Sequence, residues 1–453
     1  MRHGTAIGID FGTTNSSAAI YDGQSVRLLP IDRHGEAPEV VKTILYITRD
    51  GKQSIGEEAV QNYQQDNISR ARRFVKKWVG EISYRGGDMF YVTDVYAYVD
   101  ELAPGRLLQY LKTALRMPGY GGTSVFGQRY SAEDLATVYL RALKERVEAL
   151  LERPVKRAVL GRPVHMAGGA GYSGGEADAQ VEGRLVSAAR RAGFVDVQLE
   201  LEPVAAALEY GSRISRAENV LVFDFGGGTL DITVIRIGDK EARVFSTGGI
   251  DVAGSNFDSA IVGAKLLAHF AYGTHYGQDK RPFPRDIVEQ MCDWQTLAAL
   301  GTLEMKGFFD RVGATSDHPA RVENLESLIF NEYGYSLYSQ VEQAKIRLSN
   351  EYAAAIELQG EGISVWQMLT RAQFEAIITD YRRQVEDCLL ETVRASGLGL
   401  EQIDRVVATG GSSSIPSFSQ MLAALFGPAK LVKTSVFTSV TAGLAIKAYE
   451  LFR

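Results

Sequence analysis

The chain carries an imperfect internal repeat, and this repeat limits the fold more than any other feature of the sequence. Residues 6–14 read as a strand that ends in an Asp-Phe-Gly turn, and residues 17–21 read as a second strand. The same order returns at residues 220–229 and 232–237. Because each copy places a small polar turn between two strands, it predicts a β-hairpin. The duplication predicts two similar lobes that face one another across a cleft.

Short β-rich runs alternate with long amphipathic segments in the rest of the chain, which predicts an α/β fold. We place lobe I at residues 1–205 and lobe II at residues 206–453. The clearest helix is predicted over Ser131–Leu151, where Ser131 caps the helix and Asp134 stands at the capping-box position. The other expected helices are 176–192, 339–349, 372–395 and 415–426, and the expected strands are 26–29, 44–48, 158–161, 197–200, 220–223 and 406–409.

Composition and charge exclude several classes of protein. The chain has 453 residues, of which 45% are hydrophobic and 23% charged, as in globular proteins. The formal net charge is −6 and no run of Lys and Arg forms a basic arm, so we expect no nucleic-acid partner. Cys292 and Cys388 form no CxxC motif, which argues against a zinc site or a disulfide framework. The N-terminus does not read as a signal peptide and no apolar run reaches about 18 residues, so we expect a cytoplasmic protein and no membrane partner.

The two repeated turns are candidate phosphate-binding sites. Glycine lets the backbone approach a ligand closely, and successive N–H groups and hydroxyls can then bind phosphate oxygens. The residues of these turns are Gly12, Thr13 and Thr14 in the first copy and Gly226, Gly227, Gly228 and Thr229 in the second. Asp10 and Asp224 end the preceding strands, where a carboxylate beside a polyphosphate can hold Mg²⁺ through its waters. The alternative is that both are ordinary hairpins whose glycines satisfy a turn.

A third glycine cluster follows a predicted strand and opens a predicted helix. Gly410, Gly411 and Ser412 put backbone donors and a helix N-terminus at one point, which suits the sugar and α-phosphate of a nucleotide. A plain N-capped turn is the alternative. Gly169–Gly174 also spells GxGxxG, but residues 162–168 separate it from the strand, so we do not predict a dinucleotide site there.

In this order the three glycine motifs resemble those of the actin-like ATPase superfamily, and the residues between them resemble the 70-kilodalton heat-shock (DnaK-type) chaperones. This resemblance covers almost the whole sequence. The segments that carry it are Ser54–Ala59 (similar to IGxxA), Lys76–Gly80 (KRLIG), Leu201–Gly211 (NEPTAAAxAYG), Ala253–Asp258 (GGxxFD) and Glu342–Ser349 (ExAKxxLS).

The resemblance implies a role for each matching residue. Lys76 would lie near the γ-phosphate of ATP and orient the attacking water with Glu202, and Asp231 is a further candidate for orienting water. Asp224 would act in catalysis and, with Asp10, bind hydrated Mg²⁺, while Thr13, Thr14 and Thr229 would cradle phosphates. The implied nucleotide contacts outside the two turns are Gly254, Glu342, Lys345, Ser349, Gly410, Gly411 and Ser412.

The chain also departs from the family pattern. The family holds adenine between two arginines, and Ile346 and Ser414 stand at those positions, while Phe437 replaces an acidic residue. Residues 82–130 are the least alike, and residues 259–341 form an enlarged part of lobe II. The sequence ends at Arg453, directly after a further, closing helix that we expect there. We therefore expect no peptide-binding domain and a likeness to the single-domain, YegD-like branch.

The function expected from these features is slow hydrolysis of Mg-ATP to ADP, coupled to opening and closing of the cleft. Two alternatives remain open: a nucleotide sensor that does not hydrolyse, and a small-molecule kinase on the same fold. The sequence indicates a nucleotide ligand but identifies neither a client nor a partner protein.

Overall fold

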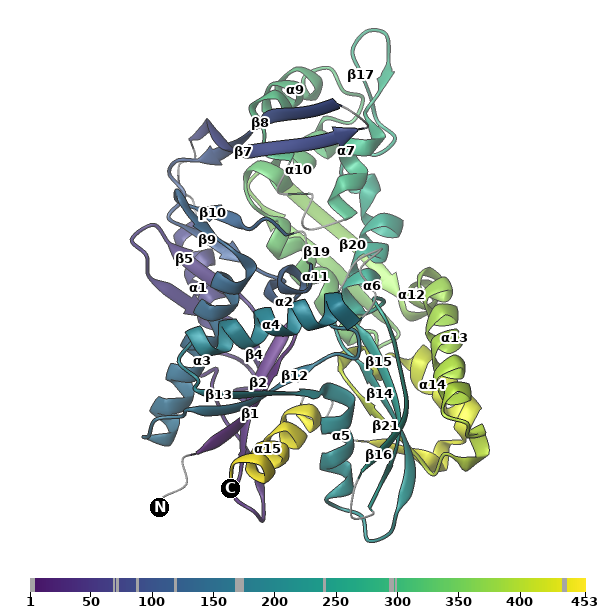
Figure 1. The fold of residues 1–453 in the computed structure, drawn as a ribbon. Coiled ribbons are helices and arrows are strands. Elements are labelled where there is room, and N and C mark those ends of the chain that lie inside the picture. Colours follow the sequence, from purple (N-terminus) through teal and green to yellow (C-terminus); the bar gives the residue numbers. More distant parts are fainter. Residues whose placement is uncertain are drawn as a thin grey trace. The chain divides into compact units, whose positions relative to one another are not determined.

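The computed structural model describes residues 5–67, 70, 73–86, 89–117, 120–167, 175–238, 242–292, 297, 300–433 and 438–453 (Figure 1). The chain divides into two compact units. Unit 1 comprises residues 1–68, 104–254 and 381–453, and unit 2 comprises residues 69–103 and 255–380. The lobes proposed at 1–205 and 206–453 were drawn from the repeat and stay a prediction. In the described part of the chain, every helix is too short or too polar to cross a lipid bilayer.

The first sheet of unit 1 contains the first copy of the repeat. Its strand order is β13-β12-β1-β2-β3, and β4 (Val41–Lys42) pairs with β2. β1 (Ala6–Phe11) and β2 (Asn15–Tyr21) form an antiparallel hairpin in which Asp10 lies opposite Ser17. β12 (Arg157–Arg162) runs parallel to β1, and β13 (Asp196–Leu201) runs parallel to β12. The predicted hairpin is confirmed.

The second sheet repeats this arrangement, with the order β16-β15-β14-β21-β22. β14 (Glu218–Phe225) and β15 (Leu230–Ile237) form the antiparallel hairpin, and β21 (Arg405–Thr409) runs parallel to β14. β16 (Arg243–Ile250) and β22 (Leu431–Lys433) are the outer strands. Each sheet therefore contains a hairpin with a parallel strand beside its first strand.

Side chains alternate between the two faces of a strand, and this alternation decides which face Asp10 and Asp224 share with their neighbours. Ile7, Ile9 and Phe11 of β1 pack in the core with α3 (Ala132–Leu151), while a Cβ on Gly8 would collide with Leu444 of α15 (Ser439–Phe452). Because successive residues of a strand face opposite sides, Asp10 shares the α15 face with Gly8. In the second sheet, Val220 and Val222 pack against α5 (Glu202–Gly211), and Asp224 shares their face.

Most predicted elements are present with small shifts at their ends. Ser131 caps α3 through a capping box with Asp134, as predicted. The helix expected at 372–395 is two helices, α12 (Arg371–Ile377) and α13 (Thr379–Ala395), because the backbone of Ile378 leaves helical geometry. The helix expected at 339–349 is α11 (Gly334–Arg347). The expected helices at 176–192 and 415–426 are α4 (Gly175–Arg191) and α14 (Pro416–Phe426).

The remaining elements of unit 1 surround these sheets. A three-stranded sheet consists of β6 (Gln53–Ile55), β5 (Leu45–Thr48) and β9 (Gly105–Leu108), beside α1 (Gly56–Asn67). The short helix α2 (Leu111–Arg116) precedes the hairpin of β10 (Thr123–Val125) and β11 (Gln128–Tyr130). β3 spans Val26–Leu28.

Unit 2 contains antiparallel two-stranded ribbons, of which the shortest pairs β17 (His275–Tyr276) with β18 (Arg281–Pro282), and several helices. β19 (Ala353–Gly360) pairs with β20 (Ile363–Thr370), and β7 (Phe74–Gly86) pairs with β8 (Met89–Asp100). The helical elements are α6 (Gly254–Ile261), a π-helical turn over Val262–Leu266, α7 (Arg285–Glu289), α9 (Leu303–Gly313), α10 (Pro319–Phe330) and α11. Within residues 285–292 the structure describes α7 followed by a 3₁₀ turn, Gln290–Cys292.

Candidate functional site

Four carboxylates from four different elements of unit 1 form an acidic cluster: Asp10, Glu202, Asp224 and Asp231. Asp10 and Asp224 end the first strands of their hairpins, and Asp231 lies opposite Asp224 on β15. Glu202 is the first residue of α5, where Pro203 starts the helix. Glu202, Asp224 and Asp231 are buried and Asp10 is half-buried. The sequence predicted all four as site residues, and the structure brings them together.

Burial and mutual repulsion raise the pKa values of this cluster. Burial and then the charge of Glu202 raise the pKa of Asp10 to about 7. Burial, Glu202 and the other aspartates raise the pKa of Asp224 well above its usual value. Burial and Glu202 raise the pKa of Asp231 to about 6, although the amide of Val164 and the hydroxyl of Thr229 lower it. Such a cluster needs a cation to be stable when ionised.

Lys112 on α2 is the cation that the sequence analysis missed. Its Nζ lies 2.6 Å from Oε1 of Glu202, and the two side chains are 6% and 10% exposed. The charge of Lys112 also lowers the pKa values of Asp10 and Asp224. A buried lysine with a carboxylate partner at this distance is a charged ion pair held in a low-dielectric environment. The sequence carries no local signal for Lys112, because the burial of this side chain results from tertiary contacts.

Lys76, the lysine indicated by the family resemblance, belongs to unit 2. Its backbone lies on β7 opposite Tyr98, and its side chain is outside what the structure describes. The predicted role of Lys76 therefore stays untested.

The two glycine turns approach each other within unit 1. A Cβ on Gly227 would lie 2.8 Å from Oγ1 of Thr14, and a Cβ on Gly228 would collide with Oγ1 of Thr13. The hydroxyl-bearing turn of one hairpin thus lies directly against the glycine turn of the other. Only residues without a side chain fit on the second hairpin here.

The third glycine motif, which follows β21, contacts the same turn at Gly226. Ser412 donates a hydrogen bond through Oγ to the carbonyl oxygen of Gly226 (2.7 Å), and the N–H of Gly254 donates to the same oxygen (3.3 Å). Gly410 has a φ of 78°, and a Cβ there would collide with the carbonyl group of Phe225. Gly411 begins the short 3₁₀ helix Gly411–Ser414. The structure therefore places the predicted residues of 12–14, 226–229, 254 and 410–412 in one neighbourhood.

The predicted nucleoside-binding residues on α11 belong to unit 2. Nζ of Lys345 lies 2.8 Å from Oδ2 of Asp258, and these side chains are 10% and 11% exposed. The pKa of Asp258 is raised to about 7. Burial raises this pKa most, the charge of Lys345 lowers it, and the charge of Glu342 raises it. Glu342 is half-buried, Ile346 is exposed, and Ser349 lies beyond the end of α11. Phe437 lies outside the described residues.

The residues present fit a hydrated magnesium ion. Buried carboxylates with raised pKa values favour a divalent cation, and Mg²⁺ prefers carboxylate oxygens while keeping several of its waters. Among the described residues, no three His, Cys, Asp or Glu side chains converge as a set of direct ligands. Asp10 and Asp224, at the ends of the two hairpins, remain the candidates to hold water-bound Mg²⁺.

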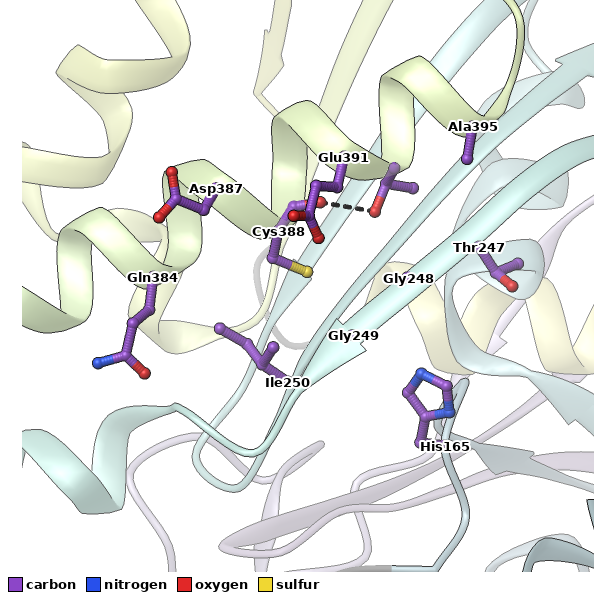
Figure 2. A pocket seen from close by; sticks show the side chains of 11 residues that line it. His165, Thr247, Gly248, Gly249, Ile250, Gln384, Asp387, Cys388, Glu391 and Ala395 are labelled. Carbon is purple, nitrogen blue, oxygen red and sulfur yellow. Dashed lines mark hydrogen bonds between the residues drawn. The ribbon is translucent and has the colours of Figure 1, made fainter. Parts of the chain in front are cut away.

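A cavity of about 460 Å³ lies between β16 and α13 in unit 1, and His165 and Gly249 are among its lining residues (Figure 2). Gly248 and Gly249 line one side, and Gln384, Asp387, Cys388 and Glu391 line the helical side. Burial raises the pKa of the Cys388 thiol to about 11, so this side chain is a neutral thiol at neutral pH. None of the predicted site residues lines this cavity.

Two α/β sheets with the same hairpin, each ending in an aspartate beside a glycine- or threonine-containing turn, define the class of actin-like ATPase folds. The Hsp70 protein family model matches residues 6–284 and 332–451, and the chain belongs to the Hsp70 family. Members of this family bind and hydrolyse ATP. The unmatched residues 285–331 lie in unit 2 and include α7, α9 and α10.

Proposed function

We propose that this protein binds Mg-ATP at the paired glycine turns of unit 1 and hydrolyses it slowly. The observation that carries the proposal is the buried Lys112–Glu202 pair, which lies among Asp10, Asp224 and Asp231 beside those turns. Family membership supports ATP as the nucleotide. Coupling of hydrolysis to movement of the lobes, and a role in chaperoning, follow from the same family reasoning and belong to the proposal.

Phosphate binding would rest on the hairpin turns. The turn at 226–228 has no side chains, so its N–H groups can approach phosphate oxygens closely. Thr13, Thr14 and Thr229 add hydroxyl donors to the same neighbourhood. Phosphoryl transfer depends mainly on positioning and on charge stabilisation, which such a set of donors provides.

Asp10 and Asp224 would hold Mg²⁺, which neutralises charge on the phosphates when it is bound. Lys112 would place a positive charge beside the transferred phosphoryl group, a role that the sequence analysis gave to Lys76. Glu202 holds the Lys112 ammonium in place through their 2.6 Å contact. Glu202 and Asp231 would accept hydrogen bonds from the attacking water, and one of these carboxylates would take its proton. The water oxygen would bond to the γ-phosphorus as the bond from that phosphorus to the ADP oxygen breaks, and ADP would leave.

The test compares three lysine substitutions. Lys112→Met should lower the rate of phosphate release by roughly 10²-fold or more while Mg-ATP still binds. Lys144→Met is the matched control, because Lys144 makes a 2.6 Å pair with Glu148 that is equally short and separate from the cluster. Lys76→Ala tests the sequence-based assignment. Calorimetric titration with Mg-ATP and a phosphate-release assay give the two readouts.

The outcomes of these assays decide between the candidate functions. Loss of turnover in Lys112→Met alone supports the proposal, and equal loss in Lys144→Met contradicts the role of Lys112. Binding of Mg-ATP with turnover that depends on neither Lys112 nor Lys76 would favour a nucleotide sensor. Turnover that appears only when a sugar or polyol is added would favour a small-molecule kinase. No binding at millimolar Mg-ATP would exclude all three.

A further inference from the structure

Unit 1 contains a second buried cation that the proposed mechanism does not use. Arg116 ends α2 and is 5% exposed. Its Nε donates a hydrogen bond to the carbonyl oxygen of Met166 (3.1 Å), and its Nη2 donates to the carbonyl oxygen of His165 (3.0 Å). The same Nη2 lies 2.9 Å from Oδ1 of Asp251. One guanidinium group thus connects α2 to two separate segments of the chain.

The first of these segments lies against the acidic cluster. It follows β12, and the N–H of Val164 donates a hydrogen bond of 2.6 Å to Oδ1 of Asp231. A Cβ on Gly249 would lie 3.3 Å from Oδ1 of Asp231 and 3.5 Å from Cδ2 of His165, so His165 and Asp231 both lie close to Gly249. Residues 164–166 are therefore held by Arg116 and in turn bind Asp231.

The second segment leads to the glycine turn. Asp251 follows β16 and precedes Gly254, whose N–H donates to the carbonyl oxygen of Gly226. The ion pair with Arg116 fixes the chain three residues before this contact. Each of the two segments that Arg116 holds is thus linked to the proposed phosphate and magnesium site. The first segment bonds Asp231, and the second leads to Gly254, which bonds Gly226.

Lys112 and Arg116 stand four positions apart on α2, so they lie on the same face of the helix. A helix of six residues is not stable alone, and it begins after Tyr110, whose φ of 55° is in the left-handed region. The position of α2 therefore depends on its tertiary bonds. Lys112 ties it to Glu202, and Arg116 ties it, through residues 164–166, to Asp231.

We infer that Arg116 is a positioning residue, which fixes Lys112 and Asp231 relative to one another across the proposed site. This inference rests on the proposed function. Arg116 does not touch the substrate: it acts by holding α2, residues 164–166 and Asp251 together. Removing it leaves two carbonyl oxygens without their donor and frees α2 at one end.

The experiment uses the whole chain with Arg116→Met, Arg116→Lys and a matched control, Arg146→Met. Arg146 also joins a carboxylate and two carbonyl oxygens, because it bonds Glu58 at 2.6 Å and the carbonyl oxygens of Ile31 at 3.1 Å and Ile55 at 3.0 Å. In the described structure these bonds involve neither α2, nor the cluster, nor residues 164–166. Amide hydrogen exchange of the nucleotide-free protein measures how firmly residues 164–166 are held. Steady-state hydrolysis of Mg-ATP gives kcat and KM.

Arg116→Met should speed exchange at residues 164–166 and lower kcat by about tenfold or more, with KM for Mg-ATP changed less than about threefold. Arg116→Lys should restore part of kcat, because an ammonium can still reach one of the three acceptors. Arg146→Met should leave kcat and the exchange at 164–166 as in the wild type.

Two results would overturn the inference: unchanged exchange at 164–166 in Arg116→Met, or faster exchange there with kcat no lower than in Arg146→Met. Failure of the proposed function looks different, because turnover would then be independent of Lys112 in a protein with intact Arg116. In that case exchange at 164–166 still decides whether Arg116 holds this segment.

Discussion

Asp224 on β14 lies directly opposite Asp231 on β15, so the second hairpin carries two buried carboxylates at neighbouring positions on one face. Like charges opposite each other in a hairpin are destabilising. Burial and this repulsion together raise the pKa of Asp224 far above that of an exposed aspartate. An arrangement of this kind is maintained when a bound cation offsets its cost.

The first prediction is that Mg²⁺ binding releases protons. With pKa values of about 7 for Asp10 and about 6 for Asp231, part of the cluster is protonated at pH 6 in the metal-free protein. Mg²⁺ has to displace these protons, so its affinity should rise between pH 6 and pH 8. Calorimetric titration in two buffers with different ionisation enthalpies measures the number of protons released. Asp10→Asn should reduce this number, and identical heats in both buffers would contradict the prediction.

The second prediction concerns stability and pH in the absence of metal. The folded pKa values of Asp10 and Asp231 are raised, so between about pH 4 and 7 the folded state binds more protons than the unfolded state. The free energy of unfolding should therefore fall as the pH rises through this range, and added Mg²⁺ should restore it. Urea unfolding at pH 5 and pH 8 measures the change. Asp231→Asn should flatten the dependence, whereas a higher stability at pH 8 without metal would refute the assignment.

The third prediction is that Gly227→Ala weakens Mg-ATP binding by about tenfold or more, because a Cβ there would lie 2.8 Å from Oγ1 of Thr14 and push the two turns apart. Gly183→Ala on α4 is the matched control, since no atom lies within 4 Å of its added Cβ. Alanine in a helix interior should stabilise the protein by about 0.5–1 kcal/mol. Calorimetry and thermal unfolding of both variants separate the two effects, and equal affinities would show that the turns need not touch.

The fourth prediction concerns the buried pair Asp258–Lys345. Lys345→Met leaves Asp258 buried without its partner and should cost about 3–5 kcal/mol of stability at pH 8. Lys52→Met removes an ion pair whose side chains are 82% and 58% exposed, and should leave the stability almost unchanged, because water screens the pair. Urea unfolding of the two variants and of the Asp258→Asn/Lys345→Met double variant measures these costs. The double variant should recover part of the loss, and a Lys345→Met protein as stable as Lys52→Met would contradict the burial of this pair.

The fifth prediction is that Cys388 reacts slowly although it lines a cavity. Its pKa of about 11 leaves a thiolate fraction roughly a hundredfold below that of an exposed cysteine at pH 8. The alkylation rate with iodoacetamide, read by mass spectrometry, should rise strongly when the protein is unfolded in urea. A rate in the folded protein equal to the unfolded rate would show that the thiol is not in this environment.

The repeat, the hairpins and the meeting of the three glycine motifs could all be predicted from the sequence. These features depend on local signals: alternation along a strand, turn residues and the capping box at Ser131. Asp10 and Asp224 of the acidic cluster could be predicted as well, because they stand at strand ends that the duplication relates to each other. Glu202 and Asp231 were predicted only from the family resemblance.

The cations around the cluster could not be predicted in the same way. Lys112 and Arg116 lie on a helix of six residues, too short for a periodic pattern, and their burial results from tertiary contacts that a single sequence does not display. The resemblance of residues 76–80 to the family's lysine segment predicts Lys76 instead. The backbone of Lys76 lies on a strand of unit 2. The break at Ile378 was missed for a related reason, because apolar residues continue at helical spacing through it.

The helix α15 is the last element of the chain, yet it covers the first strand. A Cβ on Gly443 would collide with the carbonyl group of Ala205, and Oγ of Ser17 hydrogen-bonds Oγ1 of Thr441. During synthesis on the ribosome, the α15 side of β1 and β2 therefore stays uncovered until residues 439–452 have emerged. Unit 1 reaches its native packing only after translation of this helix, and until then the newly made chain presents an open sheet face to the chaperones of the cell.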